Sequence, residues 1–151
     1  MGYYMRYISF DSQPIDLGTI ETALKQIDAA YHVRVSDIPG LGELFHGEFS
    51  CGEIEINGSE DDIFADDITE FRELVGEATT LHEQHVLDVL NQATWMVAVE
   101  TFWEGDQSEA VLSKIDPLWD WLFINRKGVL QADFEGFYDE SGVIVPRNFM
   151  I

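Results

Sequence analysis

The chain has 151 residues, 46% of them hydrophobic and 13% aromatic, so it is long enough to bury one substantial core. Its 29 acidic and eight basic residues give a formal charge of −21, which disfavours unaided binding to nucleic acid or to anionic membranes. A basic protein partner fits this charge. Solubility and adaptation to a salty host are alternative explanations that need no partner.

The single cysteine, Cys51, excludes an intramolecular disulfide, and the first ten residues lack the pattern of a signal peptide. No apolar run approaches the roughly 20 residues that span a bilayer. Because no linker rich in Pro, Gly or Ser divides the chain, we expect a single cytoplasmic domain over residues 1–151.

The first third of the chain alternates between strand and helix patterns. Residues 3–10 and 31–36 favour strands, and residues 16–30 between them carry apolar side chains at helical spacing. Residues 43–50 and 53–58 then alternate with period two, but the phase slips by one position between them. Gly52 is therefore expected at a β-bulge or a hairpin turn.

Seven carboxylates cluster in residues 57–73 around the start of a predicted helix, namely Glu60, Asp61, Asp62, Asp66, Asp67, Glu70 and Glu73. Phe64, Ile68 and Phe71 mark the buried face of this helix. Asp67 and Glu70 have the offset of a capping box, so we interpret most of the cluster as a helix start. The pattern of a calcium-binding loop is absent.

Residues 79–93 predict another helix, with Thr80 and Glu83 in capping-box register. His82 and His85 lie three residues apart on it and are candidate metal ligands beside Glu83. A zinc site needs a third ligand, however, and the zinc-protease motif needs a four-residue spacing. We therefore expect His82 to be a partly buried, hydrogen-bonded side chain.

Residues 93–103 are apolar on both faces, as expected of a central strand, except for Glu100. This carboxylate is expected to pair with Arg6 or Arg34, or to lie at an exposed strand end. Residues 108–128 predict a helix that Pro117 either kinks or divides into two.

Two tryptophans of this helix are two residues apart and cannot share a face. Trp119 falls in the apolar stripe and is expected in the core, whereas Trp121 falls at its edge. Trp121 is expected to cover a neighbouring segment, with a contact to a partner as the alternative.

The chain closes with alternating residues 128–135, a turn and a short return strand. The alternation places Leu130, Ala132 and Phe134 on one face and Gln131, Asp133 and Glu135 on the other. The whole order predicts an α+β two-layer sandwich, mainly antiparallel, with helices on one face. Its first part has a ferredoxin-like β-α-β-β-α-β order, extended by a helix and a C-terminal hairpin.

The other face of such a sheet is expected to be open. Glu53, Glu55, Asp133 and Glu135 alternate away from apolar neighbours there, and Arg6, His32 and Arg34 are the expected cations on other strands. We interpret these four acids, with Trp121, as candidate contacts for a partner. A solvated face with weak ion pairs is the alternative.

Enzyme motifs are absent from the sequence: it has no phosphate-binding Gly-rich loop and no Ser elbow, and no cofactor is predicted. Cys51 and His46 are the only nucleophile and base in proximity, and a regular strand would point them to opposite sides. We therefore predict a non-enzymatic binding module that masks a basic partner, in the manner of an inhibitor or immunity protein, and that can self-associate. The alternative is a small metal-assisted enzyme using His82, His85 and an acid.

Overall fold

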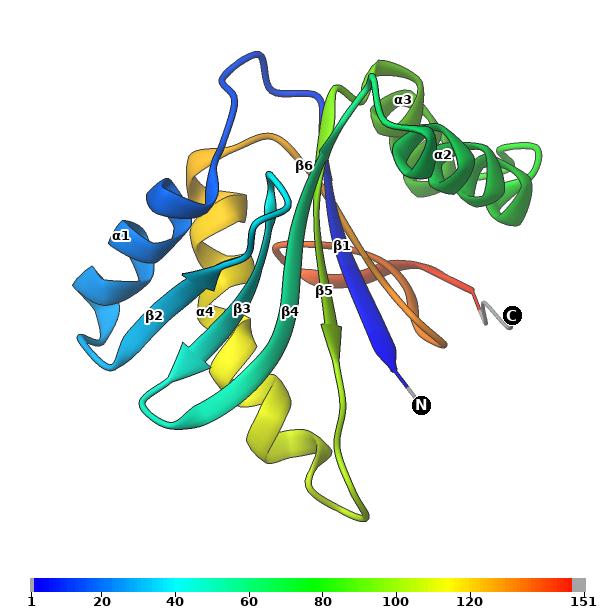
Figure 1. The fold of residues 1–151 in the computed structure, drawn as a ribbon. Coiled ribbons are helices and arrows are strands. Elements are labelled where there is room, and N and C mark those ends of the chain that lie inside the picture. The colour runs from blue at the N-terminus through cyan, green and yellow to red at the C-terminus, as the bar shows by residue number, and fades with distance from the viewer. Residues whose placement is uncertain (1, 148–151) are drawn as a thin grey trace.

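The computed structural model describes residues 2–147, which form an α+β fold with one antiparallel sheet of eight strands and four helices (Figure 1). The strands are β1 (Tyr3–Ser9), β2 (Tyr31–Val35), β3 (Leu41–His46), β4 (Phe49–Gly58), β5 (Trp95–Thr101), β6 (Gly128–Ala132), β7 (Gly136–Asp139) and β8 (Gly142–Pro146). The helices are α1 (Leu17–Ile27), α2 (Asp62–Val75), α3 (Leu81–Gln92) and α4 (Ser108–Asn125). Among the same residues, no helix combines the length and the apolarity needed to cross a bilayer.

The order of strands across the sheet is β2-β3-β4-β5-β1-β6-β7-β8, so the N-terminal strand lies in the middle. This order does not confirm the ferredoxin-like core. Instead, α4 joins β5 to β6 with β1 inserted between them, and the α2-α3 pair joins the adjacent strands β4 and β5. The α2-α3 pair therefore extends a connection that a short hairpin turn could have made.

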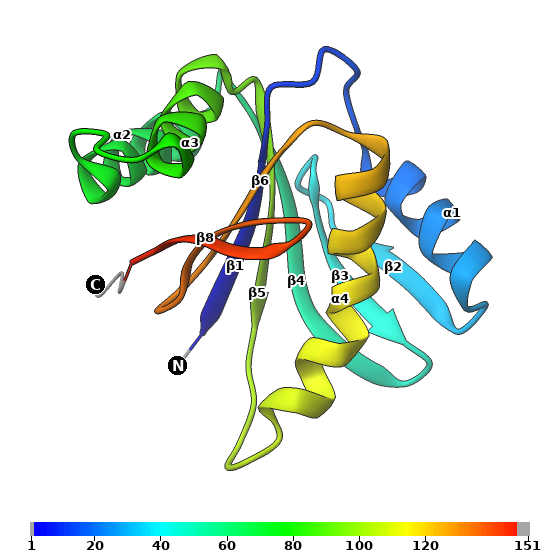
Figure 2. The same ribbon diagram turned by 180° about the vertical axis from the view of Figure 1, so that it is seen from behind.

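Helices lie on both faces of the sheet, which corrects the expectation of helices on one face (Figures 1 and 2). One face packs against α1 and α4 through a cluster that includes Tyr7 and Val97. The opposite face packs against α2 and α3 through Ile8, Met96 and Phe71. The central strands β1 and β5 are thus apolar on both sides, and each apolar face needs its own covering layer.

The α2-α3 pair covers only one end of its face (Figure 1). Its apolar cluster reaches Ile8, Met96 and Val129, which neighbour one another across β1, β5 and β6. Farther along the same face, Glu53 is exposed, whereas Glu55 is only half-buried. This uncovered part of the sheet, on the face of α2 and α3, is where charged side chains gather.

Two local predictions are confirmed. The register between β3 and β4 shifts between Leu44 and Phe45, opposite Gly52, which has a φ of 125°. A Cβ atom at Gly52 would lie 2.2 Å from a backbone oxygen of β5, so the bulge requires glycine. At the start of α3, the Glu83 N–H donates to the Thr80 hydroxyl at 3.1 Å, which is one of the two bonds of a capping box. The Glu83 carboxylate accepts from the Thr79 N–H at 3.0 Å rather than from the Thr80 N–H.

Two other local predictions are wrong. The helix α2 begins at Asp62 rather than at Asp67, because Asp61 ends the preceding turn by accepting a hydrogen bond from the Gly58 N–H at 2.8 Å. Asp67 therefore lies inside the helix. The helix α4 runs through Pro117, so the alternative of two abutting helices is wrong, whereas a kink at Pro117 stays a prediction. Ser108 is its first residue, and the N-cap position is Gln107.

The alternating C-terminal pattern also misleads, because it continues beyond the end of a strand. The strand β6 ends at Ala132, and the chain turns through Phe134, which has a φ of 66°. The Glu135 N–H closes this turn by donating to the Ala132 carbonyl at 3.2 Å. Phe134 is 49% exposed rather than part of the core, and Asp133 and Glu135 point to different surroundings.

Candidate functional site

The four acids predicted to share one open surface lie in three environments. Glu53 and Glu55 lie on β4, on the uncovered part of the sheet. Asp133 lies on the same face but is only 5% exposed. Glu135 lies in the turn after β6 and lines a cavity beside α4, on the other face. Of the four acids, only Glu53 and Glu55 therefore share an open surface, as the sequence pattern predicted.

Asp133 is a structural carboxylate, which corrects its assignment as an open contact residue. It accepts a hydrogen bond from the Tyr4 backbone N–H at 3.0 Å and lies 3.3 Å from the Arg6 guanidinium. Gln131 donates to Asp133 at 3.3 Å and accepts from Arg6 at 2.8 Å. These bonds offset the cost of burying the charge, and they leave the side chain little surface for a partner.

Arg6 is the centre of this arrangement, which we call the Arg6 network: Arg6, Asp67, Gln131 and Asp133. Its Nε lies 3.3 Å from Asp67 of α2, so the guanidinium ties that helix to the sheet. Burial raises the pKa of Asp67, and the Arg6 charge opposes this effect. Because both of its ion-pair partners belong to the network, Arg6 is not the counter-ion that was expected for Glu100.

A second group on the same face, which we call the acidic sheet face, consists of Glu43, Glu53, Glu55 and Glu100. The strand register places Glu43 directly opposite Glu53, and Glu53 directly opposite Glu100. Side chains that oppose one another in this way share a face and lie close together. Three carboxylates thus form a row across β3, β4 and β5.

Two cations lie near this row: Arg6 lines the same cleft as Glu53 and Glu100, but only Arg34 forms an ion pair with a member of the row. Arg34 pairs with Glu43 at the sheet edge, where its side chain is 71% exposed. His32 stacks on Phe45 with ring centroids 4.9 Å apart. Among residues 2–147, no ion pair reaches Glu53, Glu55 or Glu100.

The Tyr4 side chain ends the row beyond Glu100. Burial raises the pKa of the Tyr4 hydroxyl, and so do the charge of Glu100 and a hydrogen bond to it. The row therefore creates a field that disfavours further negative charge.

A shallow cleft of about 330 Å³ lies along this surface, under the first turns of α2. Its lining includes Glu53, Glu55 and Glu100, together with Ile63, which is 56% exposed. Phe102, which directly follows β5, is 55% exposed and lines a neighbouring hollow with Glu53. Exposed apolar groups therefore lie next to unpaired carboxylates on this surface.

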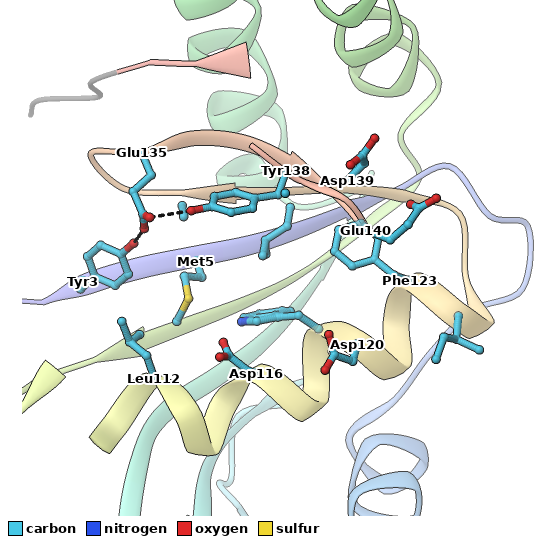
Figure 3. Close-up of a pocket in the computed structure, with 15 residues that line it drawn as sticks. Tyr3, Met5, Leu112, Asp116, Asp120, Phe123, Glu135, Tyr138, Asp139 and Glu140 are labelled. Carbon is cyan, nitrogen blue, oxygen red and sulfur yellow. Dashed lines mark hydrogen bonds between the residues drawn. The ribbon is translucent and has the colours of Figure 1, made fainter. Parts of the chain in front are cut away.

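The other face carries a cavity of about 700 Å³ (Figure 3). Glu135 is held at its rim by two tyrosines: Tyr3 donates to one carboxylate oxygen, and Tyr138 donates to the other at 2.5 Å. Burial raises the pKa of both hydroxyls, and hydrogen bonding to Glu135 raises them further. Sequence reasoning found Glu135 but not the cavity, whose walls come from distant segments.

Trp121 lies half-buried at the edge of the α4 stripe, and Trp119 lies in the core with 4% exposure, as their spacing predicted. Trp121 lines a shallow groove with α1, and the Arg126 guanidinium lies 5.3 Å from the centre of its ring. Trp121 therefore covers a neighbouring helix. A contact with a partner stays a prediction.

His82 and His85 are both exposed on α3, so the expectation of a partly buried His82 is wrong. The buried stripe of α3 consists of Val86, Val89 and Leu90 instead. Within the part of the chain that the structure describes, no group of three or more His, Cys, Asp or Glu side chains is arranged to hold a metal ion. The metal-assisted alternative stays a prediction.

Cys51 is fully buried in the core, and this burial raises the pKa of its thiol to about 11. The thiol is therefore neutral near pH 7 and a poor nucleophile. The ring of His46 makes its hydrogen bond with the Asp28 carboxylate, at 2.8 Å. The two side chains thus have separate structural roles.

Comparisons of the chain with protein-family models, with curated proteins and with solved structures find no match. Any function must therefore be inferred from the chemistry of the acidic sheet face and of the cavity that Glu135 lines.

Proposed function

We propose that the protein is a binding module that masks a basic surface of another protein, with the acidic sheet face as its contact. One observation carries this proposal: Glu53 lies directly between Glu43 and Glu100, and no described cation pairs with Glu53 or Glu100. Arg34 pairs with Glu43, and the Tyr4 hydroxyl bonds to Glu100, but no described hydrogen bond or ion pair requires Glu53 in this row. A Lys or Arg side chain from a partner would supply the missing charge.

The energetics favour this use of the row. Like charges directly opposite one another on adjacent strands destabilise a sheet, and cross-strand pairs are worth roughly 0.2–1 kcal/mol. A cationic partner would remove that cost on binding. The formal charge of −21 would also steer a basic protein toward this surface and raise its association rate at low salt.

Apolar side chains beside the row provide the other part of an interface. Ile63 and Phe102 are more than half exposed, and Phe45 presents a ring that stacks with His32. Interfaces derive most of their affinity from a few desolvated apolar anchors, whereas rim charges mainly set specificity and association rate. We therefore assign anchoring to these apolar groups and orientation to the carboxylates.

The test is capture of partners from host extract by wild type and by the triple variant Glu53→Gln, Glu55→Gln, Glu100→Gln. We expect the variant to lose basic proteins that wild type retains. For a captured protein in purified form, association with wild type should slow as salt rises, because charges are screened over about 8 Å at physiological ionic strength.

A second triple variant, Asp66→Asn, Glu70→Gln, Glu73→Gln, is the matched control. It removes the same number of charges from exposed positions of α2. If both variants lose the same partners, net charge rather than this surface is responsible. If neither variant loses any, the acidic sheet face is not the contact.

A further inference from the structure

The cavity beside α4 is separate from the acidic sheet face, because it lies on the opposite side of the sheet. Its floor comes from Met5, Leu130 and Ala132 of the strands, and its wall comes from Trp119 and Phe123 of α4. A volume of about 700 Å³ falls within the roughly 300–1,000 Å³ that small-molecule sites occupy. The interior is therefore large enough and apolar enough for an organic ligand.

The rim of the cavity has a single sign of charge. Its lining includes five carboxylates and no Lys, Arg or His: Asp116, Asp120, Glu135, Asp139 and Glu140. Figure 3 shows Asp116 and Asp120 on α4 on one side, with Glu135 and Glu140 on the other side. Carboxylates above an apolar floor complement a molecule with a cationic head and an apolar body.

Three of these carboxylates, Asp116, Asp120 and Glu140, are exposed and have no hydrogen-bond or ion-pair partner among the described residues. Glu135 accepts from two tyrosines, and Asp139 accepts from the Ser141 N–H at 2.8 Å. Asp116 and Asp120, in contrast, lie four residues apart within one uninterrupted helix, where like charges destabilise. Asp116 does not cap a helix start, because α4 continues through Pro117.

The wall of the cavity also contains an unsatisfied donor. Trp119 is 4% exposed, and its buried indole Nε1–H has no acceptor among the residues described. Leaving such a donor without a partner typically costs about 1–3 kcal/mol. Aromatic faces at the same wall attract organic cations as well.

From these observations we propose that the cavity binds a small organic ammonium ion whose apolar body carries a hydrogen-bond acceptor. The ammonium group lies among Asp116, Asp120 and Glu135, and the body lies on the apolar floor. The acceptor satisfies the Trp119 Nε1–H. This site is independent of the acidic sheet face and does not require a protein partner.

The test is calorimetric titration of the purified protein with 8-amino-1-octanol. Octylamine lacks the acceptor, and 1,8-octanediol lacks the cation. We expect 8-amino-1-octanol to bind at least tenfold more tightly than 1,8-octanediol and several-fold more tightly than octylamine. Equal binding of the diol, or no binding of the amino alcohol, would overturn the proposal, and equal binding of octylamine would overturn the part assigned to Trp119.

A variant and a second ligand complete the test. Asp116→Asn with Asp120→Asn should weaken binding of the amino alcohol at least tenfold, whereas the matched pair Asp66→Asn with Glu73→Gln on α2 should not. A lysine whose α-amino and α-carboxyl groups are blocked presents the same ammonium group on a shorter alkyl chain. Tighter binding of this capped lysine than of the amino alcohol would assign the cavity to a side chain of a protein instead. Because this titration contains no partner protein, a negative result would not contradict the proposed binding of a basic protein.

Discussion

The Arg6 network and the acidic sheet face lie on the same face of the same sheet, but their carboxylates differ in what neutralises them. Asp133 and Asp67 share one buried guanidinium and are largely withdrawn from solvent. Glu53 and Glu100 face each other with no cation between them. Partnered carboxylates hold the fold together, whereas unpartnered ones lower its stability and remain available for binding.

The largest expected effect tests the partnered side of this comparison. Arg6→Ala should lower the free energy of unfolding by about 3–5 kcal/mol, because it leaves buried carboxylates without a counter-ion. Arg34→Ala removes an exposed partner of Glu43 and should cost no more than about 1 kcal/mol. Urea unfolding of both variants measures the difference. Equal losses would mean that the Arg6 network contributes no more than a surface ion pair.

A comparable effect separates the two tryptophans of α4. Trp119→Ala should cost about 3–5 kcal/mol because it truncates a core side chain. Trp121→Ala should cost less, because Trp121 is only half-buried against α1. The same unfolding measurement applies. A loss for Trp121→Ala that matches Trp119→Ala would place Trp121 in the core and remove it as a contact candidate.

A smaller change in the free energy of unfolding, of opposite sign, tests the unpaired carboxylates of the acidic sheet face. Glu53→Gln should raise the free energy of unfolding by about 0.2–1 kcal/mol at low salt, because it removes like-charge repulsion across two strand pairs. The gain should shrink in 1 M salt, where charges are screened within about 3 Å. Glu73→Gln on α2 provides the comparison. A loss of stability in Glu53→Gln would mean that this carboxylate has a structural partner after all.

The smallest effect concerns a partnered carboxylate away from the sheet. Hydrogen bonds from the Thr79 side chain and backbone, and then from Arg147, lower the pKa of Glu83 from 4.5 to about 2. This depressed pKa contributes stability that is present above pH 4.5 and is lost as the pH falls toward 2. Glu83→Gln should therefore be less stable than wild type at pH 7 and equally stable near pH 2. A difference that persists unchanged at pH 2 would exclude a titration effect.

Local signals in the sequence predicted much of the fold. The capping pair Thr80 and Glu83, the glycine bulge and the apolar strand around Val97 all depend on neighbouring residues, and the structure contains each of them. The second helical layer was missed, although the central strand was already known to be apolar on both faces. An apolar pattern on both faces of a strand requires two layers, so that signal was present in the sequence.

Most of the candidate site depended on information that local patterns do not carry. Asp133 and Glu53 have the same kind of alternating surroundings in sequence, yet only Asp133 meets Arg6 across the sheet. The turn at Phe134 moved Glu135 to another face, because a period-two pattern does not show where a strand ends. The cavity unites residues of β1, α4 and the β6–β8 segment, which only the strand order brings together.

The central position of β1 has a consequence for how the chain folds. Tyr3–Ser9 pairs on one side with β5 and on the other side with β6, so this strand is synthesised well before either of its two partner strands. Such non-local pairing raises contact order, which slows folding and prolongs the exposure of apolar strands. We expect a nascent chain that ends before Gly128 to lack the cooperative unfolding transition of the full chain in circular dichroism. A cooperative transition in that shorter chain would show that β1 and β5 can assemble without β6.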